Sequence, residues 1–233
     1  MIGGLTFLKN WIIRSELNNA LDKIFVRDIK SNKEEELIFT DEEVYDASIS
    51  HTQRDRNTDL IYISYSTPKT QARTYLYNLK TKEKKLVKEQ IIPSGHDSKN
   101  YIVQRVECNS DDGRKVPLTI TRHKDTPLDG SANLLLYGYG SYGASMSPSF
   151  SSTRLSLINR NIIWVTAHVR GGMERGMKWW KEGKLLNKKN TFNDYIAAAK
   201  FLIEKKYTSK GKIIGMGGSA GGLLMGAVVN KAP

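Results

Sequence analysis

Short runs of β-branched and aromatic residues, separated by polar turns, fill the first 93 residues of this 233-residue chain. Such runs are typical of β-strands, because branched and aromatic side chains pack well on a pleated surface. We therefore expect an all-β region here. The predicted strands are Lys23–Ile29, Val44–Ser50, Leu60–Ser66 and Thr74–Leu79.

An internal sequence repeat indicates which all-β architecture this region has. The run from Phe25 to Lys30, then a polar turn and Leu37-Ile38, resembles the run from Tyr75 to Lys80, a turn and Leu86-Val87. The offset is about 50 residues, the length of one four-stranded β-propeller blade. The repeat favours propeller blades, and a small β-sandwich is the alternative.

The pattern changes after Pro93-Ser94-Gly95, a cluster of turn-forming residues that we interpret as a domain boundary between 1–93 and 94–233. Beyond it, strand-like runs alternate with helical ones, which predicts an α/β fold with a parallel sheet and helices on both faces. We expect a hairpin at Tyr101–Cys108 and Lys115–Arg122, strands at Asn133–Tyr137, Ile162–Ala167 and Lys212–Met216, and helices at Thr153–Asn159, from near Thr191, and at Ala220–Asn230. At the second helix, Thr191 and Asp194 resemble a capping box.

The clearest chemical signal is Gly217-Gly218-Ser219-Ala220-Gly221, which fits the G-x-S-x-G nucleophile elbow. It follows an apolar strand and opens an apolar helix, and larger neighbours would collide in so sharp a turn. Ser219 would then stand at a helix N-terminus, where partial positive charge favours a developing alkoxide. The backbone N–H of Ala220 would donate to an oxyanion. A glycine-rich turn that only packs a helix on a strand is the structural alternative.

Two other interpretations of the glycines fail. Gly138, Gly140 and Gly143 have the spacing of a dinucleotide fingerprint, which needs an immediate helix and an acidic residue about 20 positions later. Instead Pro148 interrupts, and residues 144–173 contain no Asp or Glu. A phosphate-binding loop is excluded, because neither glycine cluster is followed by Gly-Lys-Ser/Thr. We expect no cofactor and no metal.

Composition removes further classes of function. No run reaches the roughly 18 apolar residues of a membrane span, and the apolar start, Met1–Ile13, lacks a basic leader and a cleavage site. The single cysteine, Cys108, excludes an intrachain disulfide and makes a cytoplasmic setting the expectation. The net charge of +12 comes from scattered lysines, so we expect no nucleic-acid partner. Lysine clusters such as Lys188-Lys189 are expected at solvated turns and helix ends.

The chain resembles the prolyl oligopeptidase family, and most closely its oligopeptidase B branch. The resemblance is dense from about residue 101 to 233 and looser before. It is carried by Leu136–Ser145, Phe150 with Ser152–Leu157, His168–Gly172, Lys188–Tyr195 and Met216–Gly226.

The resemblance implies that residues 1–93 are the last blades of a propeller and residues 94–233 the N-terminal part of an α/β-hydrolase domain, both incomplete. It implies that Ser219 is the nucleophile and that Tyr139 gives a phenolic donor to the oxyanion hole, opposite the Ala220 N–H. Without the family, Tyr139 would be interpreted as a packed aromatic residue at a sheet edge. Tyr142 would line the substrate pocket.

Short peptides cut after Lys or Arg are the substrates that the resemblance implies. The cationic side chain needs carboxylate partners. Some relatives carry aspartates in the stretch that here reads Ser147-Pro148-Ser149. The serines weaken the case for a second basic subsite.

The catalytic triad is incomplete in this sequence. An α/β-hydrolase supplies Ser, then Asp or Glu, then His, but the 14 residues after Ser219 include none of these acids and no histidine. We therefore expect an internal fragment of a serine peptidase, whose Asp and His lie either on a complementing polypeptide or in sequence that is missing here. A catalytically inactive remnant and a general esterase are the alternatives. The histidines all precede the nucleophile, and the family uses a later one; they are His51, His96, His123 and His168, the last expected to be structural.

Overall fold

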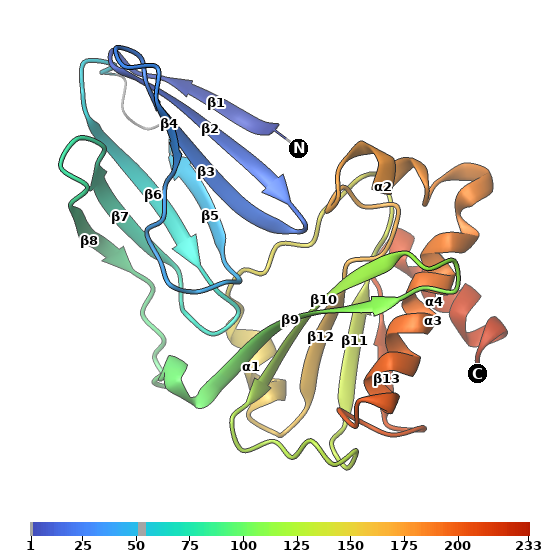
Figure 1. Ribbon diagram of the computed structural model, residues 1–233. Helices are drawn as coiled ribbons and strands as arrows, with labels where there is room; N and C mark the ends of the chain where they lie inside the picture. Colours follow the sequence, from blue (N-terminus) through green and yellow to red (C-terminus); the bar gives the residue numbers. More distant parts are fainter. Residues whose placement is uncertain (1, 51–54) are drawn as a thin grey trace. The chain divides into compact units, whose positions relative to one another are not determined.

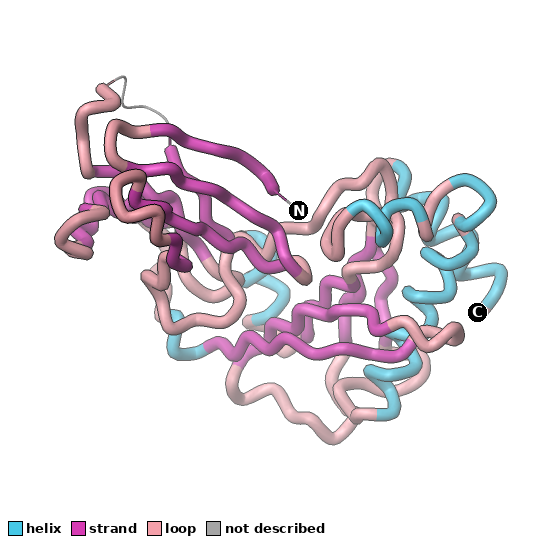
Figure 2. The backbone as a smooth tube through the Cα atoms, turned by 45° about the horizontal axis from the view of Figure 1, so that its top comes forward, coloured by secondary structure: helices cyan, strands magenta, loops and turns pink. Residues whose placement is uncertain are grey.

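The computed structural model describes residues 2–50 and 55–233, and the chain divides into two compact units. One unit is the chain up to His96 together with Ser147–Phe150, and the other is Asp97–Met146 with Ser151–Pro233. Within the described residues every helix lies in the second unit (Figure 2). No helix in those residues has the length and apolar character to cross a bilayer.

The first unit contains two four-stranded antiparallel sheets, ordered β1-β2-β3-β4 and β5-β6-β7-β8 (Figure 1). Each is an up-and-down meander of consecutive strands, the form of a propeller blade, so the predicted blade-like fold is confirmed. The strands are β1 (Ile2–Phe7), β2 (Trp11–Asn18), β3 (Leu21–Asp28), β4 (Glu34–Glu36), β5 (Asp46–Ser50), β6 (Leu60–Ser66), β7 (Arg73–Asn78) and β8 (Lys84–Glu89).

Alternation along the strands builds the core of this unit. In β6 the side chains of Ile61, Ile63 and Tyr65 are buried while the residues between them are partly exposed, as the two-residue period of a strand requires. Phe39 packs edge-on against Tyr65, with ring centroids 5.6 Å apart. The segment Ser147–Phe150 joins this unit through a 2.6 Å hydrogen bond from the Ser147 hydroxyl to a carboxylate oxygen of Asp46.

The second unit is built on a five-stranded mixed sheet, ordered β13-β11-β12-β10-β9 (Figure 1). β11 runs parallel to both β12 and β13, as the alternation of strands and helices predicts, and the β9–β10 hairpin adds an antiparallel edge. The strands are β9 (Tyr101–Asn109), β10 (Lys115–His123), β11 (Leu134–Gly138), β12 (Ile163–Ala167) and β13 (Ile213–Met216). The helices are η1 (Ser98–Asn100), α1 (Ser152–Ile158), α2 (Met177–Lys181), η2 (Leu185–Asn187), α3 (Lys189–Glu204) and α4 (Ala220–Lys231).

Helix α3 begins two residues before the expected start, and the capping-box interpretation is wrong. Its N-cap is Lys188, and both Thr191 and Asp194 are fully buried. The Thr191 hydroxyl donates to the carbonyl of Arg170 at 2.8 Å, and the Asp194 carboxylate binds the Arg170 guanidinium. Their polar groups are therefore used for tertiary contacts and not for capping the helix.

Candidate active site

Three residues, Gly217, Gly218 and Ser219, connect strand β13 to helix α4. Ser219 is the N-cap of α4, and its backbone has φ 52° and ψ −120°. A residue with a side chain rarely adopts a positive φ, and such a conformation stores strain of about 1–3 kcal/mol. The side chain of Ser219 is exposed to solvent. The chain thus turns from strand to helix within three residues at the cost of local strain, and the turn carries an exposed hydroxyl.

The glycines around Ser219 differ in how strictly the turn requires them. A Cβ added at Gly217 would lie 2.6 Å from the carbonyl oxygen of Gly221 and 3.0 Å from that of Gly138. A Cβ at Gly221 would lie 3.1 Å from the same Gly138 oxygen, whereas at Gly218 it would meet no described atom within 4 Å. Strand β11, the turn and the first turn of α4 therefore approach one another too closely for a side chain at Gly217 and leave little room for one at Gly221.

The first turn of α4 contains a backbone donor beside Ser219 that the helix itself does not use. The amide of Gly221 donates to the Gly218 carbonyl at 2.7 Å, and that of Gly222 to the Ser219 carbonyl at 2.8 Å. Ala220 is the first helical residue, so its N–H has no carbonyl one turn earlier within the helix. This N–H stands at the positive end of the helix dipole, where an oxyanion is favoured.

The parallel pairing of β11 and β13 brings Tyr139 to the same edge of the sheet as Ser219. Tyr137 pairs with Met216, and Tyr139 lies two residues beyond the first of these while Ser219 lies three residues beyond the second. The Cδ2 atom of Tyr139 lies 3.6 Å from where a Cβ of Gly221 would stand, so the half-buried ring packs against the first turn of α4. The structure therefore brings together Ser219, the Ala220 N–H and Tyr139.

Tyr142 lies on the same loop as Tyr139, but its side chain is 83% exposed. Its φ of 56° turns the chain, and the next amide, that of Gly143, donates to the Gly171 carbonyl at 2.9 Å. The expected role of Tyr142 in lining a pocket stays a prediction.

Helix α3 supports the sheet below this edge through Tyr195. The buried Tyr195 hydroxyl donates to the Leu136 carbonyl at 2.6 Å. A Cβ on Gly138 would lie 2.8 Å from the Tyr195 ring, and one on Gly215 would lie 3.2 Å from its hydroxyl. The glycines in β11 and β13 therefore let α3 pack closely beneath the elbow.

The loop after β11 interlocks with the loop after β12. Gly140 has φ +66°, and a Cβ there would overlap the Thr191 side chain; one on Gly171 would overlap the Gly140 carbonyl. The Lys188 ammonium donates to the Gly140 carbonyl at 2.5 Å and to the Ser141 hydroxyl at 2.9 Å. The expectation of a solvated Lys188 holds only in part, because its side chain is half-buried and its ammonium is hydrogen-bonded to this loop. This partial burial lowers the pKa of the Lys188 amine.

A buried ion pair fixes the second loop. Arg170 is 1% exposed, and its guanidinium donates to the Asp194 carboxylate at 2.6 Å and to the Asp112 carboxylate at 2.5 Å. Burial by itself lowers the pKa of Arg170, but the two carboxylates outweigh it and raise the pKa. Sequence reasoning missed this network, although Arg170 and Asp194 both lie in segments that carry the family resemblance.

His168 is part of the core and not a base at the elbow. Its Nε2 atom lies 2.9 Å from the Thr119 hydroxyl and 2.7 Å from the Arg105 guanidinium, and burial lowers the pKa of the imidazole. His168 follows β12, and strand β11 separates β12 from β13. Cys108 is also buried, which raises the pKa of its thiol to about 12 and keeps it protonated at neutral pH.

His96 and His123 each have a partner near their own position in the fold. The ring of His96, in the first unit, lies 2.7 Å from the Lys69 carbonyl. His123 is the last residue of β10, with its ring 3.5 Å from the Asp125 carboxylate. His51 falls outside the described residues.

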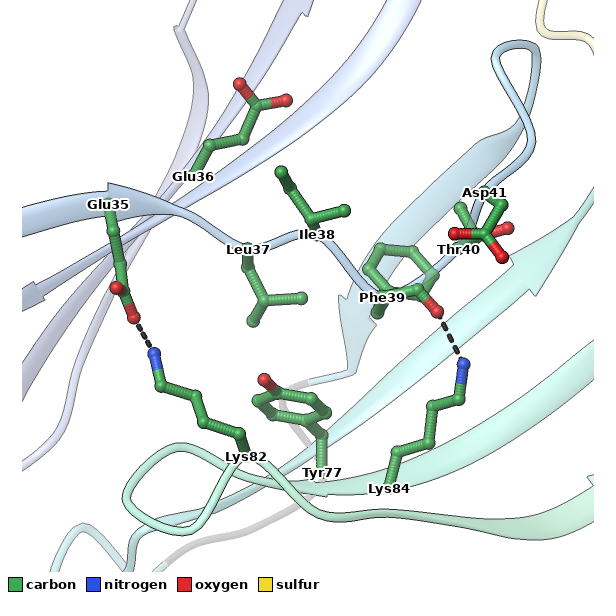
Figure 3. Close-up of a pocket in the computed structure, with 10 residues that line it drawn as sticks. All are labelled: Glu35, Glu36, Leu37, Ile38, Phe39, Thr40, Asp41, Tyr77, Lys82 and Lys84. Carbon is green, nitrogen blue, oxygen red and sulfur yellow. Dashed lines mark hydrogen bonds and ion pairs between the residues drawn. The ribbon is translucent and has the colours of Figure 1, made fainter.

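A pocket of about 550 Å³ lies in the first unit, where the segment after β4 faces the β7–β8 turn (Figure 3). Lys84 donates to the Phe39 carbonyl at 2.5 Å, and Lys82 pairs with Glu35 (Figure 3). The pocket contains none of the candidate catalytic residues. It is lined by Glu35, Glu36, Leu37, Ile38, Phe39, Thr40, Asp41, Tyr77, Lys82 and Lys84.

Comparison with known proteins gives a consistent result. Residues 148–233 match the prolyl oligopeptidase family. The chain is 41% identical over all 233 residues to dipeptidyl aminopeptidase BI of Pseudoxanthomonas mexicana, covering 32% of that protein. It is 42% identical over 216 residues, 92% of the chain, to Protease 2 of Moraxella lacunata, covering 30% of it.

The fold is similar to solved structures of oligopeptidase B. For the enzyme from Leishmania major the TM-score is 0.90 at 32% identity, over 100% of this chain and 33% of that one. For the enzyme from Trypanosoma brucei with covalently bound antipain it is 0.91 at 33% identity, over 99% of this chain and 34% of that one. The chain thus spans about a third of the length of the relatives it matches.

Proposed function

The chain belongs to the prolyl oligopeptidase family of serine peptidases, and from that premise we propose that it carries the nucleophile and both oxyanion donors of a peptidase acting on short peptides. Ser219 is the nucleophile, and Tyr139 and the Ala220 N–H hold the oxyanion. The observation that carries the proposal is the strained, exposed Ser219 between β13 and α4, with Tyr139 packed on the same helical turn.

The reaction follows from these positions. The Ser219 oxygen attacks the scissile carbonyl carbon while a histidine from outside these 233 residues takes its proton. The negative carbonyl oxygen of the tetrahedral intermediate accepts from the Ala220 N–H and the Tyr139 hydroxyl. Collapse breaks the C–N bond, the histidine returns the proton to the leaving amine, and an acyl-enzyme ester forms. Water, deprotonated by the same histidine, hydrolyses the ester.

Residues 1–93 are proposed as β-propeller blades and residues 94–233 as part of an α/β-hydrolase domain. The two four-stranded meanders and the partly parallel sheet that ends in the elbow support this division. Cleavage after Lys or Arg is the proposed specificity, supported by similarity to solved oligopeptidase B structures. Short basic peptides are then the substrates, and the Asp and His come from outside these 233 residues, for which a complementing polypeptide is one proposed source.

The test uses a hybrid enzyme, in which this chain replaces the matching segment of the Pseudoxanthomonas mexicana relative. We expect the hybrid to hydrolyse peptide amides with Arg or Lys before the cleaved bond faster than the same peptides with Ala there. Ser219→Ala should lower kcat by at least ~10³-fold, because the nucleophile is lost.

Each alternative function has its own outcome in the same assay. A hybrid that cleaves short acyl esters but no peptides would support a general esterase. A correctly folded hybrid with neither activity would support an inactive remnant. Peptide hydrolysis that survives Ser219→Ala would refute the proposed nucleophile.

A further inference from the structure

Lys188 occupies an unusual place for a lysine at the start of a helix. It is the residue between η2 and α3, and its side chain is half-buried. The ammonium turns toward the loop after β11 and donates to the Gly140 carbonyl at 2.5 Å and the Ser141 hydroxyl at 2.9 Å. Both acceptors belong to the loop that carries Tyr139, about 47 residues away in sequence.

The neighbouring lysine shows what an ordinary position at this helix start looks like. Lys189 is the first residue of α3 and is exposed. Partial burial of an ammonium costs desolvation energy, and at Lys188 this cost is offset by hydrogen bonds to a carbonyl and a hydroxyl. The two adjacent lysines therefore differ in environment and not in residue type.

The loop that Lys188 holds has little freedom left. Gly140 has φ +66°, with the Thr191 and Val169 side chains and the Arg170 carbonyl where its Cβ would be. The amide of Gly143 is bonded to the Gly171 carbonyl at 2.9 Å. Gly140 directly follows Tyr139. The contact with Lys188 therefore fixes the backbone next to Tyr139 and, with it, the direction in which the chain leaves β11.

We propose that Lys188 is a positioning residue for the oxyanion hole, which clamps the Gly140–Ser141 segment so that the Tyr139 hydroxyl meets the developing oxyanion. The inference rests on the proposed function, because it assigns Lys188 a task only if Tyr139 is an oxyanion donor. Donors to an oxyanion act through preorganisation, and a small displacement removes much of their effect. Lys188 acts through Tyr139 and does not contact the substrate.

The first test measures the clamp itself in the full 233-residue chain. Hydrogen exchange is followed at the amides of Gly143 and Ala144 in Lys188→Met and in the matched control Lys189→Met. We expect exchange at least about tenfold faster in Lys188→Met only, the size expected for losing hydrogen bonds to a charged group. Equal exchange in the two variants would overturn the proposal, whatever the activity of the chain.

The second test asks whether Lys188 acts through Tyr139, using kcat of the hybrid enzyme in a double-mutant cycle. Lys188→Met should lower kcat about tenfold or more with little change in KM, and Lys189→Met should not. In a Tyr139→Phe background the same substitution should cost less than about twofold. If Lys188 were needed only for stability, Lys188→Met would lower kcat by the same factor with and without Tyr139→Phe, or would change only the melting temperature.

The controls separate this inference from the proposed function. If Ser219→Ala or Tyr139→Phe leaves kcat unchanged, the proposed function fails. If both lower kcat while Lys188→Met matches Lys189→Met, the function stands and the role of Lys188 is refuted.

Discussion

Replacing Ser219 by glycine should make the protein more stable than the wild type, although serine is normally a favoured residue at a helix N-cap. The reason is the backbone of Ser219, at φ 52° and ψ −120°, where a Cβ is strained. Its side chain makes no cap hydrogen bond. Glycine removes the Cβ and the strain with it, and alanine keeps both.

The expected size follows from two opposing terms. Strain of this kind costs about 1–3 kcal/mol, and the extra freedom of glycine in the unfolded chain costs about 0.5–1 kcal/mol. The two ranges bracket a net gain for Ser219→Gly of about 0–2.5 kcal/mol, and their midpoints give a gain of about 1 kcal/mol. For a chain of this length 1 kcal/mol moves Tm by roughly 2–4 °C, so we expect a rise of about 2–5 °C.

Ser151 provides a matched control, because it is also a helix N-cap serine in the same unit. Its φ is −148°, which is unstrained, and its hydroxyl accepts from the Arg154 amide at 3.3 Å. Ser151→Gly should therefore lower the Tm, by the loss of a cap. Thermal unfolding of wild type, both glycine variants and Ser219→Ala is the assay. A Ser219→Gly protein no more stable than wild type would refute the strained elbow.

Other consequences concern packing, the buried ion pair and pH. Gly217→Ala should destabilise the protein by about 1–3 kcal/mol in urea unfolding, because its Cβ would lie 2.6 Å from a backbone oxygen. Gly222→Ala has open space at its Cβ and should raise the free energy of unfolding by about 0.5–1 kcal/mol in the same assay. Arg170→Met should cost about 3–5 kcal/mol in the same assay, because it leaves the Asp194 carboxylate buried without its partner; a smaller loss than 1 kcal/mol would contradict this. Burial raises the pKa of Asp22 from 3.8 to about 6. The contribution of its protonated carboxyl to stability is therefore complete below about pH 3.8 and is lost as the pH rises through about 6. Asp22→Asn should remove this loss from a series of Tm measurements between pH 4 and 7, and an unchanged series would count against the prediction.

Local patterns in the sequence predicted the elements that position the elbow. Gly217 to Gly221 is a short-range signal, since the steric demand acts between residues a few positions apart. The strand at Leu60–Ser66 has the predicted bounds, because its alternation is regular. β1 was missed as a strand, since Gly3 and Gly4 interrupt the pattern on which such a prediction depends.

Contacts between distant segments were beyond the sequence. Lys188 lies in a charged run, which is typical of a solvated helix end, and only the fold shows that its ammonium reaches Gly140. Thr191 and Asp194 have the spacing of a cap, yet the tertiary partner Arg170 takes both. In each case a local pattern gave way to a partner that folding brings from elsewhere in the chain.

The central claim is that Ser219 is the nucleophile, and covalent labelling of the hybrid enzyme tests it most directly. A fluorophosphonate should form one adduct, which mass spectrometry locates on the peptide containing Ser219, and peptide hydrolysis should stop in proportion to labelling. An adduct on another residue, or hydrolysis that continues when Ser219 is fully labelled, would contradict the claim.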